Sequence, residues 1–355
     1  MKIGFVAWNR FQVAQVAPIL QSQCDAVLIF QSDRAGADTT IPASPPEWCS
    51  VLSITRQATA ELDGIFDAVL TQTTTPETAD FSRTKVIAVQ YSMAKERHQY
   101  GPWHFMTDGR LAYGPYSNDI LNFYGNSFSV GNPRFDVLFN GQADPEIQAK
   151  IAETLSPDKK TVLYVPTYGK LSSFESFSSS IPELSERFNL IISGHHNTLL
   201  REKERSKVIE ELGLANSADI TPYYYDAADL VVSDYSGAIF DALLVQRPVV
   251  LFRPDHGNKI GVENLTADSI EVAREGAIGP VVRSSSDIAD CLEATLDNHV
   301  FAAANAELRK ECFANVGTAS EAAYSAIIEI VNDTQAKPKV HQWVKRVLKG
   351  PKKTK

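Results

Sequence analysis

The segment from Asp229 to Phe252 carries residues whose types and spacing suit phosphate binding. Its sequence, DLVVSDYSGAIFDALLVQRPVVLF, predicts a strand at Leu230 to Val232, a helix from Ala238 to Gln246 and a second strand at Val249 to Phe252. Two hydroxyls and several free backbone N–H groups at a helix N-terminus favour an anion. The turn before the helix is therefore predicted to bind the diphosphate of a nucleotide, and helix capping is the alternative explanation. The turn consists of Ser233, Asp234, Tyr235, Ser236 and Gly237.

Two histidines follow the predicted strand Leu190 to Ile192. After Ser193 and Gly194 come His195 and His196, whose ring N–H groups can donate hydrogen bonds to a phosphate or to a leaving group. An ordinary surface loop explains the same residues, so both interpretations stay open at this point.

The predicted strand Thr161 to Val165 ends at a rigid stop, Pro166, which is followed by Thr167, Tyr168 and Lys170. A hydroxyl, an aromatic ring and a cation after a strand are suited to holding a base or a phosphate. The serine-rich stretch that follows is either a mobile flap or a linker.

In the first half of the chain, the predicted strand Lys85 to Val89 leads into a loop with Lys95, Arg97 and His98 within four residues. Histidine is the side chain best suited to accept a proton near neutral pH. His98 is therefore the leading candidate for a base that activates an acceptor hydroxyl, with Glu96 as the second. A polar loop with an incidental histidine is the alternative.

Three other residues complete the set of candidates. Arg134 follows a turn and is expected to face either a cleft between domains or solvent, and Asp136 is expected to cap the next helix. Asp241 lies seven residues after Asp234, and local pairing on the helix explains it better than a shared cation does. The four cysteines are scattered with no pair at metal-ligand spacing, which indicates a reducing cytoplasm. No dedicated metal site and no cofactor are implied.

Strands that alternate with helices predict an α/β protein with parallel sheets covered on both faces. With 355 residues the chain is long enough for two domains, expected at 1–145 and 146–332, followed by a tail at 333–355. An Ala-rich run from Phe301 to Val331 has helical periodicity, is interrupted near Gly317 and is expected to close the fold. We expect two Rossmann-like domains facing an interdomain cleft, with ligands at the carboxyl ends of the strands.

The composition, 44% hydrophobic and 22% charged, is typical of a soluble globular protein. The start of the chain, MKIGFVAW, lacks a basic region followed by a long apolar stretch, which predicts no export. No window approaches the roughly 20 apolar residues of a spanning helix. We therefore expect a cytoplasmic protein whose membrane contact, if it has one, is peripheral on the inner face.

Charge is distributed unevenly along the chain. The formal net charge is -9, yet the residues after Asp333 include eight Lys or Arg and no acid, so the rest of the chain is strongly acidic. An acidic body makes nucleic acid a poor partner. The tail predicts a basic amphipathic segment on anionic lipid, with a solvated terminus as the alternative. Its apolar residues at helical spacing are Val340, Trp343, Val344, Val347 and Leu348.

Three segments, in this order, resemble the CDP-glycerol glycerophosphotransferase family, the teichoic acid primases and polymerases that share the GT-B fold. GNPRFDVL (131–138) is similar to a glycine-x-proline-arginine-x-aspartate element of the family, and KKTVLYVPTY (159–168) to its strand ending in Pro-Thr. SDYSGAIFDALLVQRPVVLF (233–252) is similar to the family signature of Asp-Tyr-Ser-Ser followed by Phe-Asp and Arg/Lys-Pro, and is the most specific of the three. The resemblance covers roughly residues 85 to 330.

The resemblance implies a GT-B-like fold in which the C-terminal half binds a nucleotide-activated donor. Two departures are visible: Gly237 replaces the second serine of the turn, and Gln90-Tyr91-Ser92-Met93 stands where many members carry Trp-His-Gly before a lysine. The base of the family therefore cannot be carried over, and His98 replaces it on chemical grounds. The shift suggests a different acceptor, such as a capsular or cell-surface saccharide.

The expected function is transfer of a phosphoalditol from a CDP-linked donor to a hydroxyl of a saccharide or lipid-linked acceptor. The alternatives are a GT-B glycosyltransferase that uses a nucleotide sugar and a non-catalytic nucleotide-binding subunit of a polymer assembly complex. The catalytic candidates are His98 and His195, and the acceptor-side candidates are Lys95, Arg97 and Arg134. The donor-binding candidates are Pro166, Thr167, His196, Ser233, Asp234, Tyr235, Ser236, Gly237 and Asp241.

Overall fold

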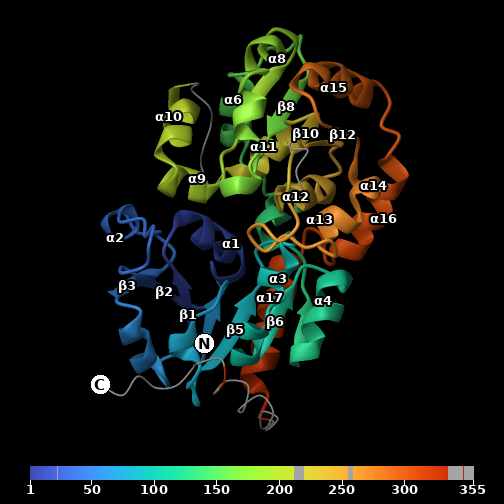
Figure 1. Cartoon of the computed structure of the whole chain (residues 1–355). Helices are drawn as coiled ribbons and strands as arrows, with labels where there is room; N and C mark the ends of the chain where they lie inside the picture. The colour runs from blue at the N-terminus through green and yellow to red at the C-terminus, as the bar shows by residue number, and fades with distance from the viewer. Residues whose placement is uncertain (22, 212–219, 255–258, 335–346, 348–355) are drawn as a thin grey trace. The chain divides into compact units, whose positions relative to one another are not determined.

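The computed structural model describes residues 1–21, 23–211, 220–254, 259–334 and 347 (Figure 1). The chain divides into two compact units. The first unit contains Met1–Tyr91, Tyr100–Asp136 and the C-terminal segment that begins at Phe313, and the second unit contains Ser92–Gln99 and Val137–Cys312. Among the described residues no helix is long and apolar enough to cross a membrane.

The first unit is built on a seven-stranded sheet in the order β3-β2-β1-β4-β5-β6-β7, in which all neighbouring strands are parallel. The chain moves from β1 outward to β2 and β3 and then returns to the other side of β1 at β4. The topological switch point, where ligands of such sheets bind, therefore lies between β1 and β4. The strands are β1 (Lys2–Ala7), β2 (Asp25–Gln31), β3 (Ser50–Ile54), β4 (Ala68–Thr71), β5 (Lys85–Val89), β6 (Gly109–Ala112) and β7 (Ser127–Ser129).

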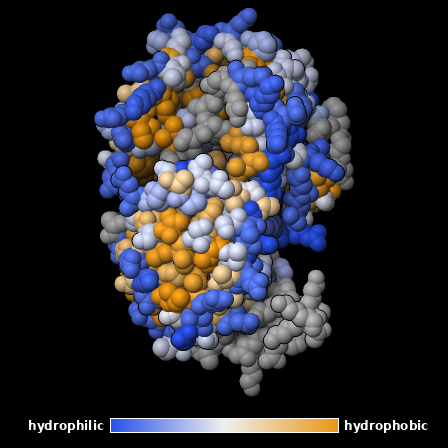
Figure 2. All heavy atoms as spheres, turned by 90° about the vertical axis from the view of Figure 1, so that its left-hand side faces the viewer, coloured by the Kyte–Doolittle hydropathy of each residue, from blue (hydrophilic) through white to orange (hydrophobic). Residues whose placement is uncertain are grey.

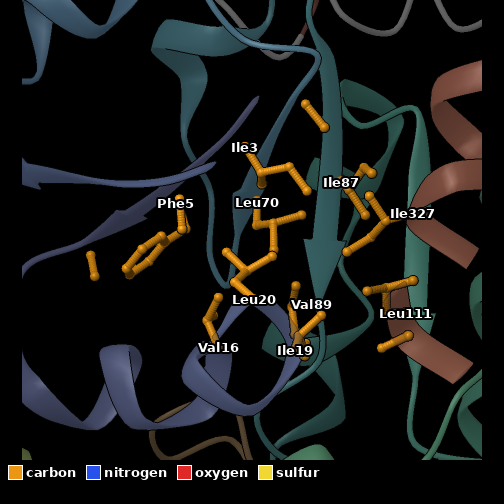
Figure 3. Packing of buried hydrophobic residues seen from close by; sticks show 14 of the residues in the cluster. Ile3, Phe5, Val16, Ile19, Leu20, Leu70, Ile87, Val89, Leu111 and Ile327 are labelled. Carbon is orange, nitrogen blue, oxygen red and sulfur yellow. The ribbon is translucent and has the colours of Figure 1, made fainter. Parts of the chain in front are cut away.

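Helices α1 and α17 cover one face of this sheet. Figure 3 shows Ile327 of α17 beside Ile87 and Leu111 of the sheet, and Leu20 of α1 beside Leu70. All of these side chains are buried, and full burial of one such aliphatic side chain contributes about 1.5–3 kcal/mol. The helical segments of this unit are α1 (Arg10–Leu20), α2 (Thr40–Ala43), η1 (Gln57–Leu62), η2 (Pro76–Thr78), η3 (Pro102–Met106), α4 (Pro115–Leu121), η4 (Asn122–Tyr124), η5 (Pro133–Phe135) and α17 (Ala319–Asn332).

The opposite face of the first sheet is covered by short 3₁₀ helices and loops rather than by long helices. A second apolar cluster there joins Val6 and Val69 of the strands to Leu62 and Phe66. Apolar side chains also gather on the surface of the first unit on the side where β3 lies (Figure 2). Both faces of the sheet are therefore buried, one under long helices and the other under short elements.

The second unit has a five-stranded parallel sheet in the order β12-β11-β10-β8-β9. Its switch point lies between β8 and β10, because the chain goes from β8 to β9 on one side and then crosses to β10 on the other. The strands are β8 (Thr161–Tyr164), β9 (Asn189–Ile192), β10 (Leu230–Ser233), β11 (Val249–Phe252) and β12 (Val281–Val282).

Short helices surround the second sheet, and its core joins strand residues such as Val162 and Val232 to Phe177 and Leu292 of the helices. The segment α5 (Asp136–Phe139) begins at the boundary between the units. The helical segments of the second unit are α3 (Glu96–Gln99), α6 (Pro145–Ala152), η6 (Gly169–Leu171), α7 (Phe174–Ser178), α8 (Ile181–Arg187), α9 (His196–Arg201), α10 (Lys203–Glu211), α11 (Thr221–Ala227), α12 (Ala238–Leu244), α13 (Ile270–Ala273), α14 (Glu275–Ile278), η7 (Ser285–Asp287), α15 (Ile288–Asp297) and α16 (Ala302–Cys312).

The division of the chain differs from the expected domains 1–145 and 146–332 in two places. The interrupted helical run is α16 and α17, as expected, but α17 belongs to the first unit, because its apolar residues Ala323, Ile327 and Ile330 pack on the first sheet. Asp136 caps this helix rather than the next one: its carboxylate accepts the N–H groups of Ala319 at 3.1 Å and Ser320 at 2.7 Å.

The other difference is the segment Ser92–Gln99, which leaves the first unit after β5 and is part of the second. It was expected on the acceptor side with the rest of the first half. The predicted basic tail lies outside the described residues except for Val347.

Candidate functional site

The candidate site lies at the switch point of the second unit, where β8 and β10 run side by side (Figure 1). Ser233 ends β10 and is fully buried, and its Oγ donates a hydrogen bond to the carbonyl oxygen of Val165 at 2.8 Å. The N–H of Val165 donates in turn to the carbonyl oxygen of Val232 at 2.9 Å. These bonds make the loop after β8 and the turn after β10 start next to each other.

Asp234 fixes the two loops in place. Its Oδ1 accepts the N–H groups of Thr167 at 2.8 Å and Tyr235 at 2.6 Å, and its Oδ2 accepts the N–H of Ser173 at 2.9 Å and the hydroxyl of Ser173 at 3.0 Å. Burial raises the pKa of Asp234, while these hydrogen bonds favour its charged form. The side chain is fully buried, so Asp234 shapes the turn.

Carboxylates also hold the rest of the loop after β8. The N–H of Gly169 donates to Glu202 Oε1 at 2.8 Å, and the N–H of Lys170 donates to Glu263 Oε1 at 2.9 Å. Gly169 has a φ of 70°, a left-handed conformation that favours glycine. A Cβ there would also lie 2.1 Å from Glu263 Oε1, so this position between the two carboxylates favours glycine for a second reason. Because the N–H groups of Thr167, Gly169 and Lys170 are occupied by carboxylates, an anion at this loop must be bound by other groups.

Lys95 places a positive charge next to the loop after β8. Its Nζ donates to Thr167 Oγ1 at 2.8 Å and lies 4.6 Å from the ring centroid of Tyr168. Burial lowers the pKa of Lys95, whereas the carboxylates of Asp234, Glu263 and Glu271 raise it. An ammonium group held between these carboxylates and an aromatic ring is suited to meeting an incoming phosphate.

A reciprocal pair of hydrogen bonds holds Lys95 on the second unit. The N–H of Lys95 donates to Glu271 Oε1, and the N–H of Ile270 donates to Glu96 Oε1, both at 2.8 Å. Lys95 has a φ of 61°, a left-handed conformation that non-glycine residues rarely adopt, and it is stabilised here by the bond to Glu271. Glu271 is fully buried, and within the described part of the chain its Oε2 has no hydrogen-bond partner.

His195 lies in a stack of rings after β9. Its ring centroid is 4.5 Å from that of Tyr168 and 4.2 Å from that of His196. Burial, with contributions from His196 and Lys95, places the pKa of His195 well below its usual range, so the ring is neutral at pH 7. Nδ1 accepts the N–H of Asn197 at 3.1 Å, so the proton is on Nε2. His195 is therefore a neutral hydrogen-bond donor.

The turn after β10 provides backbone donors. Ser236 Oγ accepts the N–H of Ala238 at 3.3 Å and caps α12, which has seven residues. Among the described residues, the N–H groups of Ser236 and Gly237 have no acceptor. They remain available to a ligand.

Gly237 is explained by the close approach of Ser92. A Cβ at position 237 would lie 2.2 Å from Ser92 Oγ, so the Ser92 hydroxyl occupies the space of a side chain at this position. A serine at position 237 would therefore need Ser92 Oγ to move.

Arg253 holds the backbone of the turn after β10 through hydrogen bonds. Its side chain is buried, its Nε and Nη2 donate to the carbonyl oxygen of Asp234 at 3.0 and 2.9 Å, and its guanidinium lies 4.3 Å from the ring centroid of Tyr235. Nη2 also donates to the carbonyl oxygen of Glu271 at 2.9 Å. Arg253 thus joins the turn to the segment that carries Glu271.

The structure brings several predicted residues together and separates others. Thr167, His195, Asp234 and Lys95 form one cluster with Tyr168. Lys95 belongs to the second unit and not to the first, where the acceptor side was predicted. Buried Pro166 starts the same loop, and His196 stacks on His195.

The remaining candidates lie apart from these contacts. Arg97 is exposed on α3, Arg134 belongs to the first unit, and Asp241 is partly exposed on α12. His98 lies on α3 in the second unit, and burial followed by repulsion from Lys95 lowers its pKa. Its role as a base stays a prediction.

Sequence reasoning missed the groups that organise the site. Arg253 had a readable signal, since it directly follows the strand β11 as a cation at a strand end. Ser92, Glu202, Glu263 and Glu271 had none, because each acts on a segment far away in the sequence. Among the described residues no group of three or more His, Cys, Asp or Glu could hold a metal ion.

Solved structures with a similar backbone show the class of fold. A variant of the wall teichoic acid polymerase TagF with CDPG superposes with a TM-score of 0.63 at 15% identity over 93% of this chain and 88% of that chain. UDP-GlcNAc 2-epimerase from Neisseria meningitidis, bound to UDP-GlcNAc, superposes with a TM-score of 0.62 at 14% identity over 93% of this chain and all of that chain. The fold is GT-B-like, as expected from the sequence.

The family is shown by a sequence match. Residues 115–329 match the model of the family described as CDP-glycerol:poly(glycerophosphate) glycerophosphotransferase, and the chain belongs to this family. The teichoic acid glycerol-phosphate transferase of Staphylococcus aureus (strain NCTC 8325 / PS 47) is 25% identical over an alignment of 206 residues. The match covers 52% of this chain and 51% of the relative. The chain thus matches about half the length of that relative.

Exchanging the side chains at positions 92 and 237 tests whether Ser92 excludes a side chain at position 237. Gly237→Ser alone is expected to lower the free energy of unfolding by about 1–3 kcal/mol and to weaken CDP binding, because its Cβ collides with Ser92. The double variant Ser92→Gly with Gly237→Ser relieves the collision and should recover both properties. Thermal unfolding and calorimetric titration with CDP measure them. A Gly237→Ser protein as stable as the wild type contradicts the assignment.

Glu271→Gln is expected to remove a pH-dependent loss of stability. Burial raises the pKa of Glu271 to about 7 from 4.5, so between these values the folded protein binds more protons than the unfolded chain. The free energy of unfolding therefore falls as the pH rises through this window, by on the order of 3 kcal/mol. Glutamine keeps an oxygen for the N–H of Lys95 and carries no charge.

Urea unfolding of Glu271→Gln and wild type from pH 5 to 8 measures this effect. The stability gained by the variant should grow with pH and level off above pH 7. Glu186→Gln, an exposed glutamate of the same unit, is the matched control and should parallel the wild type. A constant difference between Glu271→Gln and wild type across the range would rule out titration of Glu271 in this window.

Proposed function

We propose that this chain transfers glycerol phosphate or a similar phosphoalditol from a CDP-linked donor to a hydroxyl of a teichoic acid, cell-surface polysaccharide or lipid-linked acceptor, releasing CMP. Membership in the glycerophosphotransferase family supports this reaction. One observation assigns the reaction to this site: Lys95 Nζ donates a hydrogen bond to Thr167 Oγ1 at the switch point of the second sheet. The TagF structure with CDPG has the same fold.

The donor diphosphate is proposed to bind between Lys95 and the turn after β10. Lys95 contributes a positive charge, and the N–H groups of Ser236 and Gly237 contribute two hydrogen bonds. His195 Nε2–H is a third donor, suited to the phosphate oxygens because it is neutral and held by Asn197. Preorganised donors of this kind stabilise the charge that grows on the phosphate oxygens during transfer.

The chemical step is a displacement at phosphorus. The acceptor hydroxyl loses its proton to His98, and its oxygen forms a bond to the β-phosphorus of the donor. The bond from that phosphorus to the oxygen of CMP breaks, and CMP leaves with the electron pair. The lowered pKa of His98 keeps its ring neutral at pH 7, which a proton acceptor requires.

The two units are proposed to divide the substrates between them. The second unit holds the donor, and the first unit serves the acceptor, with Arg134 as its cation. Arg97 is exposed on α3 of the second unit, and we propose that it contributes a further positive charge on the side from which the acceptor approaches.

Lys95→Met tests the donor site. With CDP-glycerol and a lipid-linked or polyol acceptor, the wild type should release CMP, and kcat/KM of the variant should fall by about 10²–10³-fold, the usual loss when one charge-stabilising donor is removed. Lys160→Met is the matched control: Lys160 pairs with Asp229 at the opposite end of β8 and should leave turnover unchanged.

Identification of the released nucleotide separates the alternatives. UDP released from UDP-sugars, with no CMP from CDP-glycerol, would establish a glycosyltransferase instead. Tight CDP binding with no turnover of any donor would favour a non-catalytic subunit. Full activity of Lys95→Met would remove Lys95 from the mechanism.

We also propose that the basic tail attaches the protein to anionic lipid on the inner face of the membrane. The support is its composition, with eight basic residues and no acid after Asp333. Deletion of residues 337–355 should abolish co-sedimentation with phosphatidylglycerol vesicles and leave turnover of a soluble acceptor intact. Phosphatidylcholine vesicles are the control. Equal sedimentation of the truncated and full chains would show that the tail is not an anchor.

A further inference from the structure

The switch point of the first unit is a second place where a ligand can bind. The register pairs Phe5 of β1 with Leu70 of β4, so Trp8 and Gln72 follow the adjacent carboxyl ends of these strands. The helix α1, eleven residues long, begins just beyond at Arg10. Helix and strands together form the type of crevice in which open parallel sheets bind ligands.

Two residues of the segment that follows β4 carry buried polar atoms without partners. Gln72 is only 4% exposed, and within the described residues neither its Oε1 nor its Nε2 has a hydrogen-bond partner. Glu77 Oε2, five residues further on, is also buried without one. Buried polar groups in native proteins are nearly always paired, so three such atoms in one loop indicate a missing partner.

Threonine hydroxyls stiffen the loop that carries these atoms. Thr71 Oγ1 and Thr75 Oγ1 are 2.7 Å apart, and each donates to the carbonyl oxygen of Thr73, at 2.8 and 3.2 Å. Thr78 Oγ1 donates to the carbonyl oxygen of Thr75 at 2.9 Å. A loop tied in this way holds Gln72 and Glu77 in fixed positions, as a preformed site requires.

Arg34 completes the polar surroundings. Its guanidinium lies 4.6 Å from the ring centroid of Trp8, and its Nη2 donates to the carbonyl oxygen of Thr74 at 3.3 Å. Its Nε is held by Gln31 Oε1 at 2.8 Å. Burial lowers the pKa of Arg34, and the charge of Glu77 opposes this shift, so the two charges interact.

We infer that this crevice binds a polyhydroxylated group, the alditol or saccharide end of the acceptor. The identification of that ligand as acceptor rests on the proposed function. An amide needs both a donor and an acceptor opposite it, and a carboxylate needs a donor, which hydroxyl groups supply together. A phosphodiester group offers acceptors alone and would be repelled by Glu77, so the neutral hydroxyls of the ligand make these contacts.

Gln72→Leu tests the inference by binding rather than by turnover. The probe is a short oligo(glycerol phosphate), titrated by calorimetry into the full chain saturated with CDP, with inorganic phosphate as the comparison. Loss of two hydrogen bonds should weaken probe binding by roughly tenfold or more and leave CDP affinity unchanged. Glu77→Ala, at a partly exposed position, is the second variant and should weaken probe binding in the same direction.

Thr84→Val is the matched control. Thr84 is 2% exposed and hydrogen-bonded to Phe66 and Gly64 at the opposite end of the same sheet, so its loss should lower the melting temperature without changing probe binding. Probe binding equal to wild type in Gln72→Leu and Glu77→Ala, or no binding by the wild type, overturns the inference. Inorganic phosphate competing fully with the probe would also overturn it. Because no turnover is required, failure of CDP-glycerol as a donor would be seen separately.

Discussion

The second unit depends on one buried charge. The carboxylate of Asp234 has no contact with solvent, and a charge in that position is tolerated only when hydrogen bonds replace its hydration. The replacement comes from Thr167, Ser173 and Tyr235, which belong to two different loops. The need to pair this single group therefore sets the geometry of the loop after β8 and of the turn after β10 together.

Hydrogen bonds from backbone N–H groups to carboxylates also place a cation from a distant part of the sequence at the site. Lys95 follows a strand of the first sheet, yet its backbone is held by Glu271 and its neighbour Glu96 holds Ile270. Its left-handed conformation costs on the order of 1–3 kcal/mol, which the surrounding bonds must offset. The bonds of Glu271 and Glu96 thus keep the ammonium group of Lys95 next to Thr167.

Local sequence patterns predicted helices and strands and where several strands end. They did not predict contacts between segments that are far apart in the sequence. The strand Lys85–Val89 was predicted with its observed bounds, and Thr161 and Val249 begin strands where apolar runs indicated them. The strand β12 has only two residues, and β6 begins with a glycine and a buried arginine, Arg110, instead of an apolar run. The unit to which α17 belongs, and the carboxylates of Glu263 and Glu271, depend on contacts between segments that no window of sequence contains.

The two switch points differ in how their polar groups are satisfied, and this difference is informative about ligands. In the second unit, carboxylates occupy the N–H groups of one loop and surround Lys95, so a strongly anionic ligand gains from the cation and from the donors of Ser236 and Gly237. In the first unit, Arg34 is engaged with Gln31 and Thr74, and the unpaired atoms belong to an amide and a carboxylate. Such atoms attract hydroxyl groups more than phosphates.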